Sequence, residues 1–263
     1  MKKRKIRPSY LFLGLVLAIM YLPILLLVIY SFNESKISSV WGGFSLKWYQ
    51  QLFADEKMFE ALLNSIVLGV SSSVCAAVIG TLGAFGMAKV KSRANTAVEY
   101  LATLPIMIPE IILAMVFLAF FSLLGLPFGM TTLILGHTAF CIPYIFMLVK
   151  ARLVGMDPSL AEAAKDLGAS EVRVFLDITL PLITPAIASG MVLSFAMSFD
   201  DVLISLFVTG VNVNTLPILV YTQIKTGVTP EINALCTLML AATLLLVFVS
   251  SWLGREKTTS NPQ

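Results

Sequence analysis

Charged residues are scarce in this sequence. Asp, Glu, Lys and Arg together make up 13% of its 263 residues, whereas hydrophobic residues make up 58%. Ordinary soluble domains carry about 25% charged residues. This scarcity excludes a typical soluble domain and indicates a membrane protein.

Cysteine and histidine are also rare. Cys75, Cys141 and Cys236 all lie in apolar runs without metal-ligand spacing, so neither a disulfide framework nor a metal site is indicated. The single histidine, His137, falls inside an apolar run, and we interpret it as an interhelical hydrogen-bonding group rather than a proton relay. No His/Glu metal set and no Ser/Lys or Ser/His pairing stands out, which argues against an intramembrane enzyme.

Six apolar runs are long enough to cross a bilayer, which takes about 20 residues in a helix. They cover approximately residues 10–30, 62–88, 98–123, 130–150, 183–208 and 233–253. We therefore expect an all-α integral membrane protein with six transmembrane helices in one domain, residues 1–263. The first run follows a basic start, as in a signal peptide, but it is long and no small-residue cleavage site follows, so we interpret it as an uncleaved span.

The basic residues fall mainly on one side of these spans. Of the 18 Lys and Arg residues, 14 lie in the N-terminus, in the loops around 89–97 and 150–181, and in the C-terminal tail. The other four lie in the alternate loops. By the positive-inside rule, we expect both termini and residues 157–181 to be cytoplasmic.

The loops expected on the opposite side differ in composition. The first, about residues 32–61, is rich in aromatic residues, including Trp48. It is either an interfacial helix resting at the lipid headgroups or an aromatic wall at the mouth of a substrate path. The loop at 209–232 is polar and contains glycine and proline, so we expect irregular structure there.

A charged island, Asp157–Pro181, separates the fourth and fifth spans. Its pattern predicts two short helices with a bend at Gly168. Either Asp157 or Ser159 caps the first helix, and Ser170 caps the second. We expect the proline at the end of the island to close the second helix.

The spacing inside this hairpin matches a family signature, EAA-x3-G-x9-I-x-LP. The matching residues are Glu162, Ala163, Ala164, Gly168, Ile178, Leu180 and Pro181. On these residues the chain resembles the permease subunits of bacterial ABC importers. The resemblance implies that residues 157–181 form a cytoplasmic coupling loop that docks in a groove on an ATPase subunit. The alternative is a solvated linker that merely joins two spans.

Segments beyond the hairpin, LSFAMSFDDV at 193–202 and TPEINAL at 229–235, resemble the spermidine/putrescine branch of that family. The resemblance implies a multi-pass protein of the bacterial inner membrane that works with a second, similar permease, an ATP-binding subunit dimer and an extracytoplasmic polyamine-binding protein. ATP and Mg would bind the ATPase subunit, because this chain has no Walker A pattern, G-x4-G-K-[ST]. We expect no cofactor, no enzymatic activity and no nucleic-acid partner for the chain itself.

Three carboxylates, Glu110, Asp200 and Asp201, lie inside apolar runs that hold no Lys or Arg. Such charges cost about 2.5–3.5 kcal/mol each at the membrane centre, so they usually face a cavity or a partner. At about 1.5 Å per residue, they lie between the midplane and the outer half of their spans. A polyamine would neutralise them with its ammonium groups, while aromatic faces would contact its methylenes.

Each carboxylate also has a structural interpretation. Asp200 or Asp201 could cap a helix that restarts after a break, and Glu110, which follows Pro109, could begin a half-helix. Adjacent residues point about 100° apart on a helix, so Asp200 and Asp201 are not expected to face the same cavity. Ser198 could line the path or bond back to its helix. The candidate substrate path consists of Asp200, Asp201, Glu110, Trp48 and Ser198.

These features predict a permease subunit that forms half of the translocation path of an ATP-driven importer for spermidine or putrescine. Closure of the ATPase dimer would move the hairpin, which would switch the cavity between outward and inward access. Two alternatives stay open: a permease of the same family for another solute, and a cation channel or secondary carrier that works without an ATPase.

Overall fold

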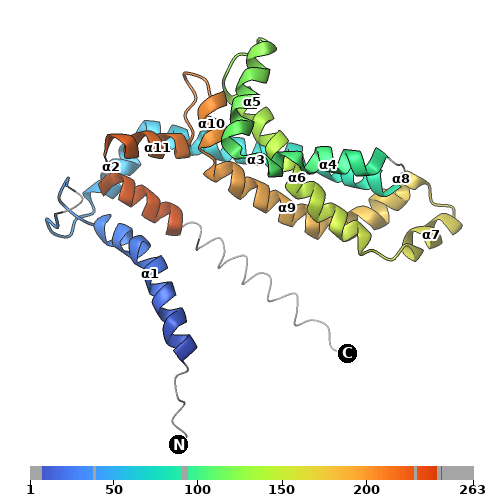
Figure 1. The fold of residues 1–263 in the computed structure, drawn as a ribbon, viewed down its shortest axis with the longest axis horizontal. Helices are drawn as coiled ribbons and strands as arrows, with labels where there is room; N and C mark the ends of the chain where they lie inside the picture. The colour runs from blue at the N-terminus through green and yellow to red at the C-terminus, as the bar shows by residue number, and fades with distance from the viewer. Residues whose placement is uncertain (1–7, 38–39, 90–93, 228–229, 242–243, 245–263) are drawn as a thin grey trace, which may run out of the picture. The chain divides into compact units, whose positions relative to one another are not determined.

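The structure, a computed structural model, describes residues 8–37, 40–89, 94–227, 230–241 and 244 (Figure 1). Over these residues the regular elements are all helices, with one isolated β-bridge between Asn33 and Phe44. The all-α prediction is therefore confirmed for the part of the chain that the structure describes. Two compact units are distinguished, one formed by residues 1–59 with 220–263 and one by residues 60–219. The single transmembrane domain stays a prediction.

The first unit begins with α1 (Pro8–Tyr30), which corresponds to the first expected span. None of its most apolar stretch is buried within the chain, so its surface suits contact with lipid. A short helix, α2 (Lys47–Ala54), follows the first loop. The same unit includes the end of α11 (Leu216–Thr226) and a shorter apolar helix, Pro230–Ala241.

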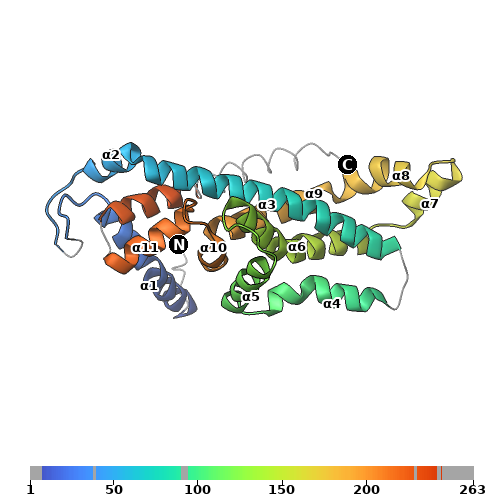
Figure 2. The ribbon, with the colours of Figure 1, turned by 90° about the horizontal axis from the view of Figure 1, so that it is seen from above.

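Three long helices run side by side in the second unit: α3 (Glu56–Lys89), whose first four residues belong to the first unit, α6 (Met130–Val154) and α9 (Leu180–Asp200) (Figures 1 and 2). Glycines allow their close approach, since a Cβ on Gly80 of α3 would lie 3.1 Å from the backbone nitrogen of Phe146 on α6. The same unit contains α4 (Ala94–Met107), α5 (Glu110–Leu123) and α10 (Leu203–Val208).

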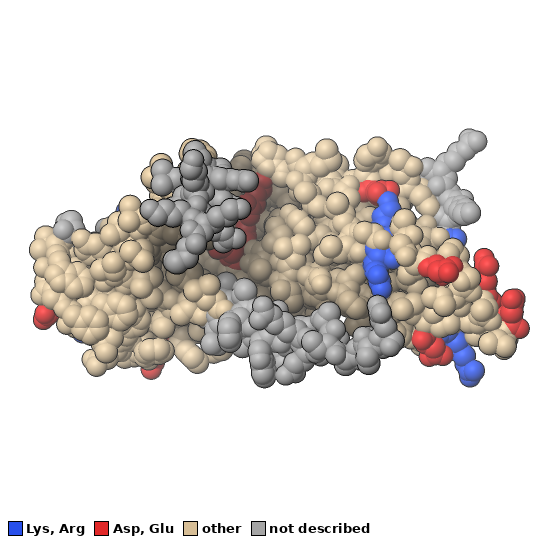
Figure 3. Space-filling view, turned by 90° about the horizontal axis from the view of Figure 1, so that it is seen from below, with Lys and Arg blue, Asp and Glu red and all other residues tan. Residues whose placement is uncertain are grey.

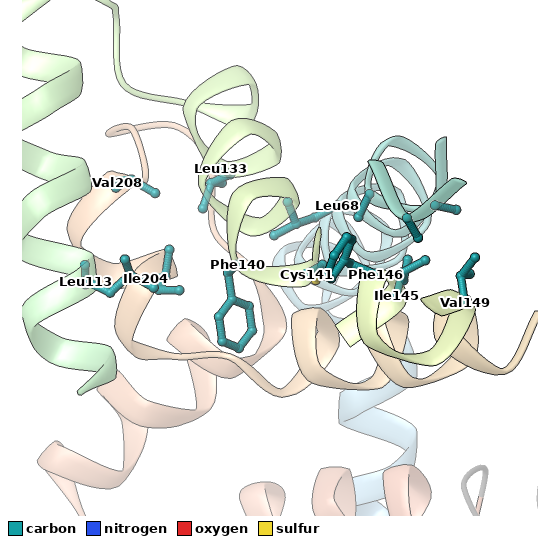
Figure 4. Packing of buried hydrophobic residues seen from close by; sticks show 14 of the residues in the cluster. Leu68, Leu113, Leu133, Phe140, Cys141, Ile145, Phe146, Val149, Ile204 and Val208 are labelled. Carbon is teal, nitrogen blue, oxygen red and sulfur yellow. The ribbon is translucent and has the colours of Figure 1, made fainter. Parts of the chain in front are cut away.

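The core of the second unit joins these helices. Figure 4 shows Leu113 of α5 facing Ile204 and Val208 of α10, with Leu133 of α6 close by. Ile204, Val208 and Leu133 are completely buried. Because burial of such a side chain contributes about 1.5–3 kcal/mol, these contacts hold the short helix α10 against its longer neighbours.

Two of the expected spans are broken rather than continuous. The span at 98–123 is the pair α4 and α5, bent by 108° at a break before Glu110. The span at 183–208 ends as a helix at Asp200, becomes extended at Asp201 and restarts as α10. Pro109 lies at the first break with extended backbone, where a residue without an N–H removes no intrahelical bond.

The described residues contain four helices that are long and apolar enough to cross a membrane, or five if the bent pair α4–α5 is one span. The expected sixth span, 233–253, lies mostly outside the described residues, as does the basic N-terminus. The number of six spans and the cytoplasmic location of both termini therefore stay predictions.

The expectation that Pro181 closes the second helix is wrong. The second arm, α8 (Glu171–Val174), passes through a π-helical turn, η1 (Phe175–Thr179), into α9, so that one helix continues to Asp200. The N–H of Leu180 donates to the carbonyl of Phe175, five residues earlier. Proline clashes with the carbonyl four residues before it, and the wider turn accommodates this clash.

The expectation of irregular structure throughout 209–232 is also wrong, because α11 occupies Leu216–Thr226. The N–H of Leu216 donates to the Ser65 hydroxyl oxygen at 2.8 Å, and Leu216 and Ile218 are buried. Pro217 stands in the first turn of the helix, where its missing N–H has no cost.

Candidate functional site

The two helix breaks of the second unit open on one cavity of about 570 Å³. Its lining includes Glu110, Phe140, Tyr144, Met197, Asp200 and Asp201. Figure 3 shows acidic side chains recessed in a hollow of an otherwise uncharged part of the surface. No Lys or Arg among the described residues lines the cavity. The structure therefore brings the three predicted carboxylates together.

Glu110 and Asp200 are the two exposed carboxylates of the cavity. Glu110 is the first residue of α5, and Asp200 is the last residue of α9. The half-helix interpretation of Glu110 is confirmed by its position directly after the break. Both side chains line the cavity that a cation would enter, and the Glu110 side chain also interacts with that of Asp201.

Asp201 lines the same cavity but is only 5% exposed. Its two carboxylate oxygens accept the backbone N–H groups of Ile204 at 3.2 Å and Ser205 at 2.8 Å. Asp201 therefore caps the restarting helix α10, as the structural interpretation anticipated. A break in the helix also explains why two adjacent aspartates reach one cavity, since the 100° spacing applies only within a continuous helix.

A chain of buried polar groups continues inward from Asp201. The Nε2 atom of His137 lies 3.3 Å from the Asp201 carboxylate and 3.0 Å from the Ser205 hydroxyl, and its Nδ1 atom lies 2.8 Å from the Ser198 hydroxyl. The Ser72 hydroxyl on α3 donates to Ser198 at 3.1 Å. The prediction that His137 bonds between helices is confirmed. Ser198 is buried in this chain and is not among the residues that line the cavity.

Two aromatic residues of the cavity were missed from the sequence. Phe140 and Tyr144 lie one turn apart on α6, with ring centroids 5.7 Å apart and edge-to-face geometry. Their faces can contact methylene groups and attract a cation. The signal that could have found them is their helical spacing from His137, at three and seven residues, which places all three on one side of α6.

Trp48 belongs to the first unit and is not among the residues that line the cavity. Its indole is buried, and the indole N–H donates to the carbonyl of Asn33 at 2.7 Å. The side chain of Asn33 accepts the N–H of Gly42 at 2.8 Å, so Trp48 stabilises a folded first loop. A role of Trp48 in the substrate path stays a prediction.

The second candidate site is the hairpin, whose first arm is α7 (Ser159–Asp166). None of the residues of α7 is buried. Leu160, Ala163, Ala164 and Leu167 recur at the three- and four-residue spacing that places them on one face, and Leu167 is 89% exposed. An amphipathic helix with its apolar face exposed is suited to docking on another protein.

The bend and the second cap of the hairpin agree with the sequence prediction. Gly168 has a φ of +83°, which residues with a Cβ rarely adopt. The Asp157 carboxylate accepts the N–H of Ser159 at 2.9 Å, which holds the pKa of Asp157 below its usual range. The Ser170 hydroxyl accepts the N–H of Arg173 at 3.4 Å. Ser170 thus caps the second arm, as predicted. The N-cap of α7 is Pro158, without a side-chain cap, so neither Asp157 nor Ser159 caps the first arm.

The remaining positions of the signature lie on the second arm. Ile178 and Leu180 are half-buried, Pro181 is exposed, and Leu180 packs against the core of the second unit. Glu162 of the first arm is exposed. The signature therefore combines an exposed first arm with a second arm that is anchored in the transmembrane part.

An ion-pair cluster that the sequence analysis missed ties the hairpin together. Glu171, the first residue of α8, pairs with Lys165 of α7 at 2.5 Å and with Lys89, the last residue of α3. The cluster joins residues that are 82 positions apart in the sequence. A pairing at that separation follows from the fold and leaves no local pattern.

Residues 76–255 match the protein family described as the binding-protein-dependent transport system inner membrane component. The chain belongs to this family. The permease is 40% identical to the spermidine/putrescine transport system permease protein PotC of Escherichia coli, over 95% of each chain. It is also 40% identical to the putrescine transport system permease protein PotI of Escherichia coli, over 89% of this chain and 86% of that one.

Two solved structures share the fold of the permease. A bacterial alginate ABC transporter, in complex with an alginate pentasaccharide-bound periplasmic protein, matches with a TM-score of 0.74 at 20% identity, over 97% of this chain and 95% of that one. The MetNI methionine ABC transporter matches with a TM-score of 0.64 at 18% identity, over 77% of this chain and 98% of that one. These likenesses show the ABC permease fold.

Proposed function

We propose that this permease forms half of the translocation path of an ATP-driven importer for polyamines, spermidine or putrescine. One observation carries the proposal: Glu110 and Asp200 are exposed to the same cavity, whose lining holds two aromatic rings and no described Lys or Arg. The homology to the polyamine permeases PotC and PotI supports the same cargo.

The cavity suits a flexible polycation chemically. Three carboxylates, Glu110, Asp200 and Asp201, line the cavity and repel one another, and no Lys or Arg among the described residues of the lining neutralises them. A polyamine supplies one ammonium group to each carboxylate, and the rings of Phe140 and Tyr144 cover the methylenes between them. The volume, about 570 Å³, lies within the range of small-molecule sites.

The hairpin supplies the link to ATP in this proposal. The exposed face of α7 docks on an ATPase subunit, with Glu162 as an anion for a basic partner and the alanines allowing close approach. The second arm continues as one helix from Glu171 to Asp200. A push on the hairpin therefore moves the same helix that carries Asp200 at its far end, about 45 Å away at 1.5 Å per residue.

The proposed assembly contains a second permease, an ATPase dimer that binds ATP and Mg, and an extracytoplasmic polyamine-binding protein, in the bacterial inner membrane. Six spans with both termini in the cytoplasm agree with the charge distribution. Asp201, Ser198 and Trp48 remain candidates for the path, and their buried hydrogen bonds favour supporting roles over direct contact with cargo.

The test is uptake of radiolabelled spermidine and putrescine by the complete importer reconstituted in liposomes, with ATP inside or absent. Asp200→Asn and Glu110→Gln should each raise the half-saturation concentration about tenfold, the value of one lost charged hydrogen bond. Glu60→Gln is the matched control, because Glu60 is exposed and does not line the cavity.

Each alternative gives a distinct result. Uptake of another solute, with no response to polyamines, indicates a permease for a different cargo. Cation flux that needs neither ATP nor the ATPase indicates a channel or secondary carrier and overturns the proposal.

A further inference from the structure

His137 connects three segments that surround the cavity. It is completely buried on α6, where its two ring nitrogens contact Ser198 at the end of α9, Asp201 in the break and Ser205 on α10. A buried polar side chain with partners on both ring nitrogens fixes the segments that it joins, since loss of any partner leaves a buried polar group unpaired.

The contact with Asp201 determines the geometry of the break. Both oxygens of this carboxylate accept backbone N–H groups from the first turn of α10, and one of them also faces His137. Asp201 is therefore fully engaged within the protein. Its neighbour Asp200 is exposed to the cavity. Because the two residues share a peptide bond, the direction of Asp200 depends on how Asp201 is held.

The same junction extends to α5 and thus to Glu110. Gly136, next to His137, lies against both helices: a Cβ there would be 3.4 Å from Ile204 of α10 and 3.5 Å from Phe117 of α5. Leu113, one turn after Glu110, packs beside Ile204 (Figure 4). A displacement of α10 would therefore move the helix that begins with Glu110.

We propose that His137 is a positioning residue for the substrate path. Its Nε2 atom holds Asp201 and the start of α10, so that Asp200 and Glu110 face the cavity together. Loss of this contact misdirects the two exposed carboxylates while the permease still assembles. The identity of the cargo in this inference rests on the proposed function; the positioning itself does not.

Two amide variants separate the ring nitrogens. In His137→Gln the amide reaches the position of Nε2, toward Asp201, whereas in His137→Asn it reaches only the position of Nδ1, toward Ser198. In the complete reconstituted importer, His137→Asn should raise the half-saturation concentration of spermidine about tenfold, and His137→Gln should restore it to near the wild-type value. The amount of assembled complex is measured for both and should be similar.

A double-mutant cycle tests the route through Asp201. If His137 acts through this carboxylate, His137→Asn combined with Asp201→Asn should give a half-saturation concentration no higher than the worse single variant. Additive effects of the two substitutions would overturn the inference. So would equal half-saturation concentrations in wild type, His137→Asn and His137→Gln, because a merely structural residue changes the amount of assembled protein and leaves that concentration unchanged.

A second readout does not depend on the cargo. A cysteine in the variant Asp200→Cys is labelled with a water-soluble thiol reagent, and the rate is corrected with the parent protein, which carries the native cysteines. His137→Asn should change this rate several-fold, and His137→Gln should not. Unchanged labelling overturns the positioning role even if the importer carries another solute, whereas changed labelling without polyamine uptake refutes only the proposed cargo.

Discussion

Replacing either of the adjacent residues Asp200 and Asp201 by asparagine exchanges one carboxylate for an amide, but we expect the two changes to affect different properties of the permease. Asp201 accepts two backbone N–H groups and contacts His137 while 5% exposed. Asp200 is exposed to the cavity. We expect Asp201→Asn to destabilise the permease, and Asp200→Asn to weaken uptake while stability is unchanged.

The size of the effect follows from the hydrogen bonds. Asparagine has one acceptor oxygen, so one backbone N–H of α10 loses its partner. A hydrogen bond to a charged group contributes about 1.5–3 kcal/mol, so the free energy of unfolding should fall by about 2–3 kcal/mol. That change lowers the ratio of folded to unfolded protein about 30- to 150-fold. Surface substitutions such as Asp200→Asn usually stay within about 0.5 kcal/mol.

Heat denaturation of the purified complex in detergent, followed by tryptophan fluorescence, measures this difference. Asp201→Asn should lower the melting temperature by about 5–10 °C, and Asp200→Asn by less than about 2 °C. Uptake per assembled complex is measured in parallel. Equal melting temperatures for the two variants would refute the assignment of Asp201 as the cap of α10, and normal uptake by Asp200→Asn would refute its role in the path.

Three further predictions concern the hairpin and the cavity. Gly168→Ala should lower uptake, because a residue with a Cβ at this positive φ costs about 1–2 kcal/mol and strains the bend. The control Gly86→Ala lies in open space on a helix and should leave uptake normal. Equal uptake by the two variants would contradict the requirement for glycine at the bend. Glu171→Gln should lower the ratio of uptake to ATP hydrolysis, with both rates measured in the same proteoliposomes. The charge exchange Glu171→Lys with Lys89→Glu should restore part of this ratio. An unchanged ratio in Glu171→Gln would show that the ion-pair cluster plays no part in coupling. Glu110→Lys should abolish polyamine uptake without preventing assembly, because a fixed ammonium takes the place of the cargo; normal uptake would exclude Glu110 from the path.

Features with a local cause were predictable from the sequence. Long apolar runs predicted long apolar helices, and the cap Ser170 lies where short-range rules placed it. The bend at Gly168 follows from the freedom of glycine at positive φ. Each of these features depends on residues that are close together in the sequence, so the sequence alone is enough to predict it.

The breaks were only half predictable. Hydropathy averages over a window, so it treats 98–123 and 183–208 as continuous spans, whereas Pro109 and the aspartate pair identify where each can break. The failure at Pro181 has the opposite origin. Proline disfavours a continuing helix, but the π-helical turn before it accommodates the ring, and packing of Leu180 in the core retains the helix.

The ion-pair cluster could not be predicted, and the aromatic cavity wall had only the spacing from His137 as a signal, because both depend on pairings across the fold. From the sequence, Phe140 and Tyr144 look like ordinary apolar positions of α6, and only the fold places them beside the break in α9, where they line the cavity. Lys89 and Glu171 meet only because the end of α3 lies beside the hairpin. Tertiary packing, rather than any propensity, creates both features.

The two helix breaks and the uninterrupted helix from the hairpin to the cavity belong to one arrangement. A broken helix places backbone ends and carboxylates at depth, which an intact apolar span cannot do. The helix from Glu171 to Asp200 is unbroken over its whole length, with an ion-paired hairpin residue, Glu171, at one end and a cavity carboxylate, Asp200, at the other. Had this helix ended at Pro181, as its sequence suggests, a movement of the hairpin would be absorbed at the joint. Because the helix continues through the π-helical turn, we expect a movement of the hairpin to reach the cavity, and we expect insertion of glycines at Thr179 to uncouple ATP hydrolysis from uptake.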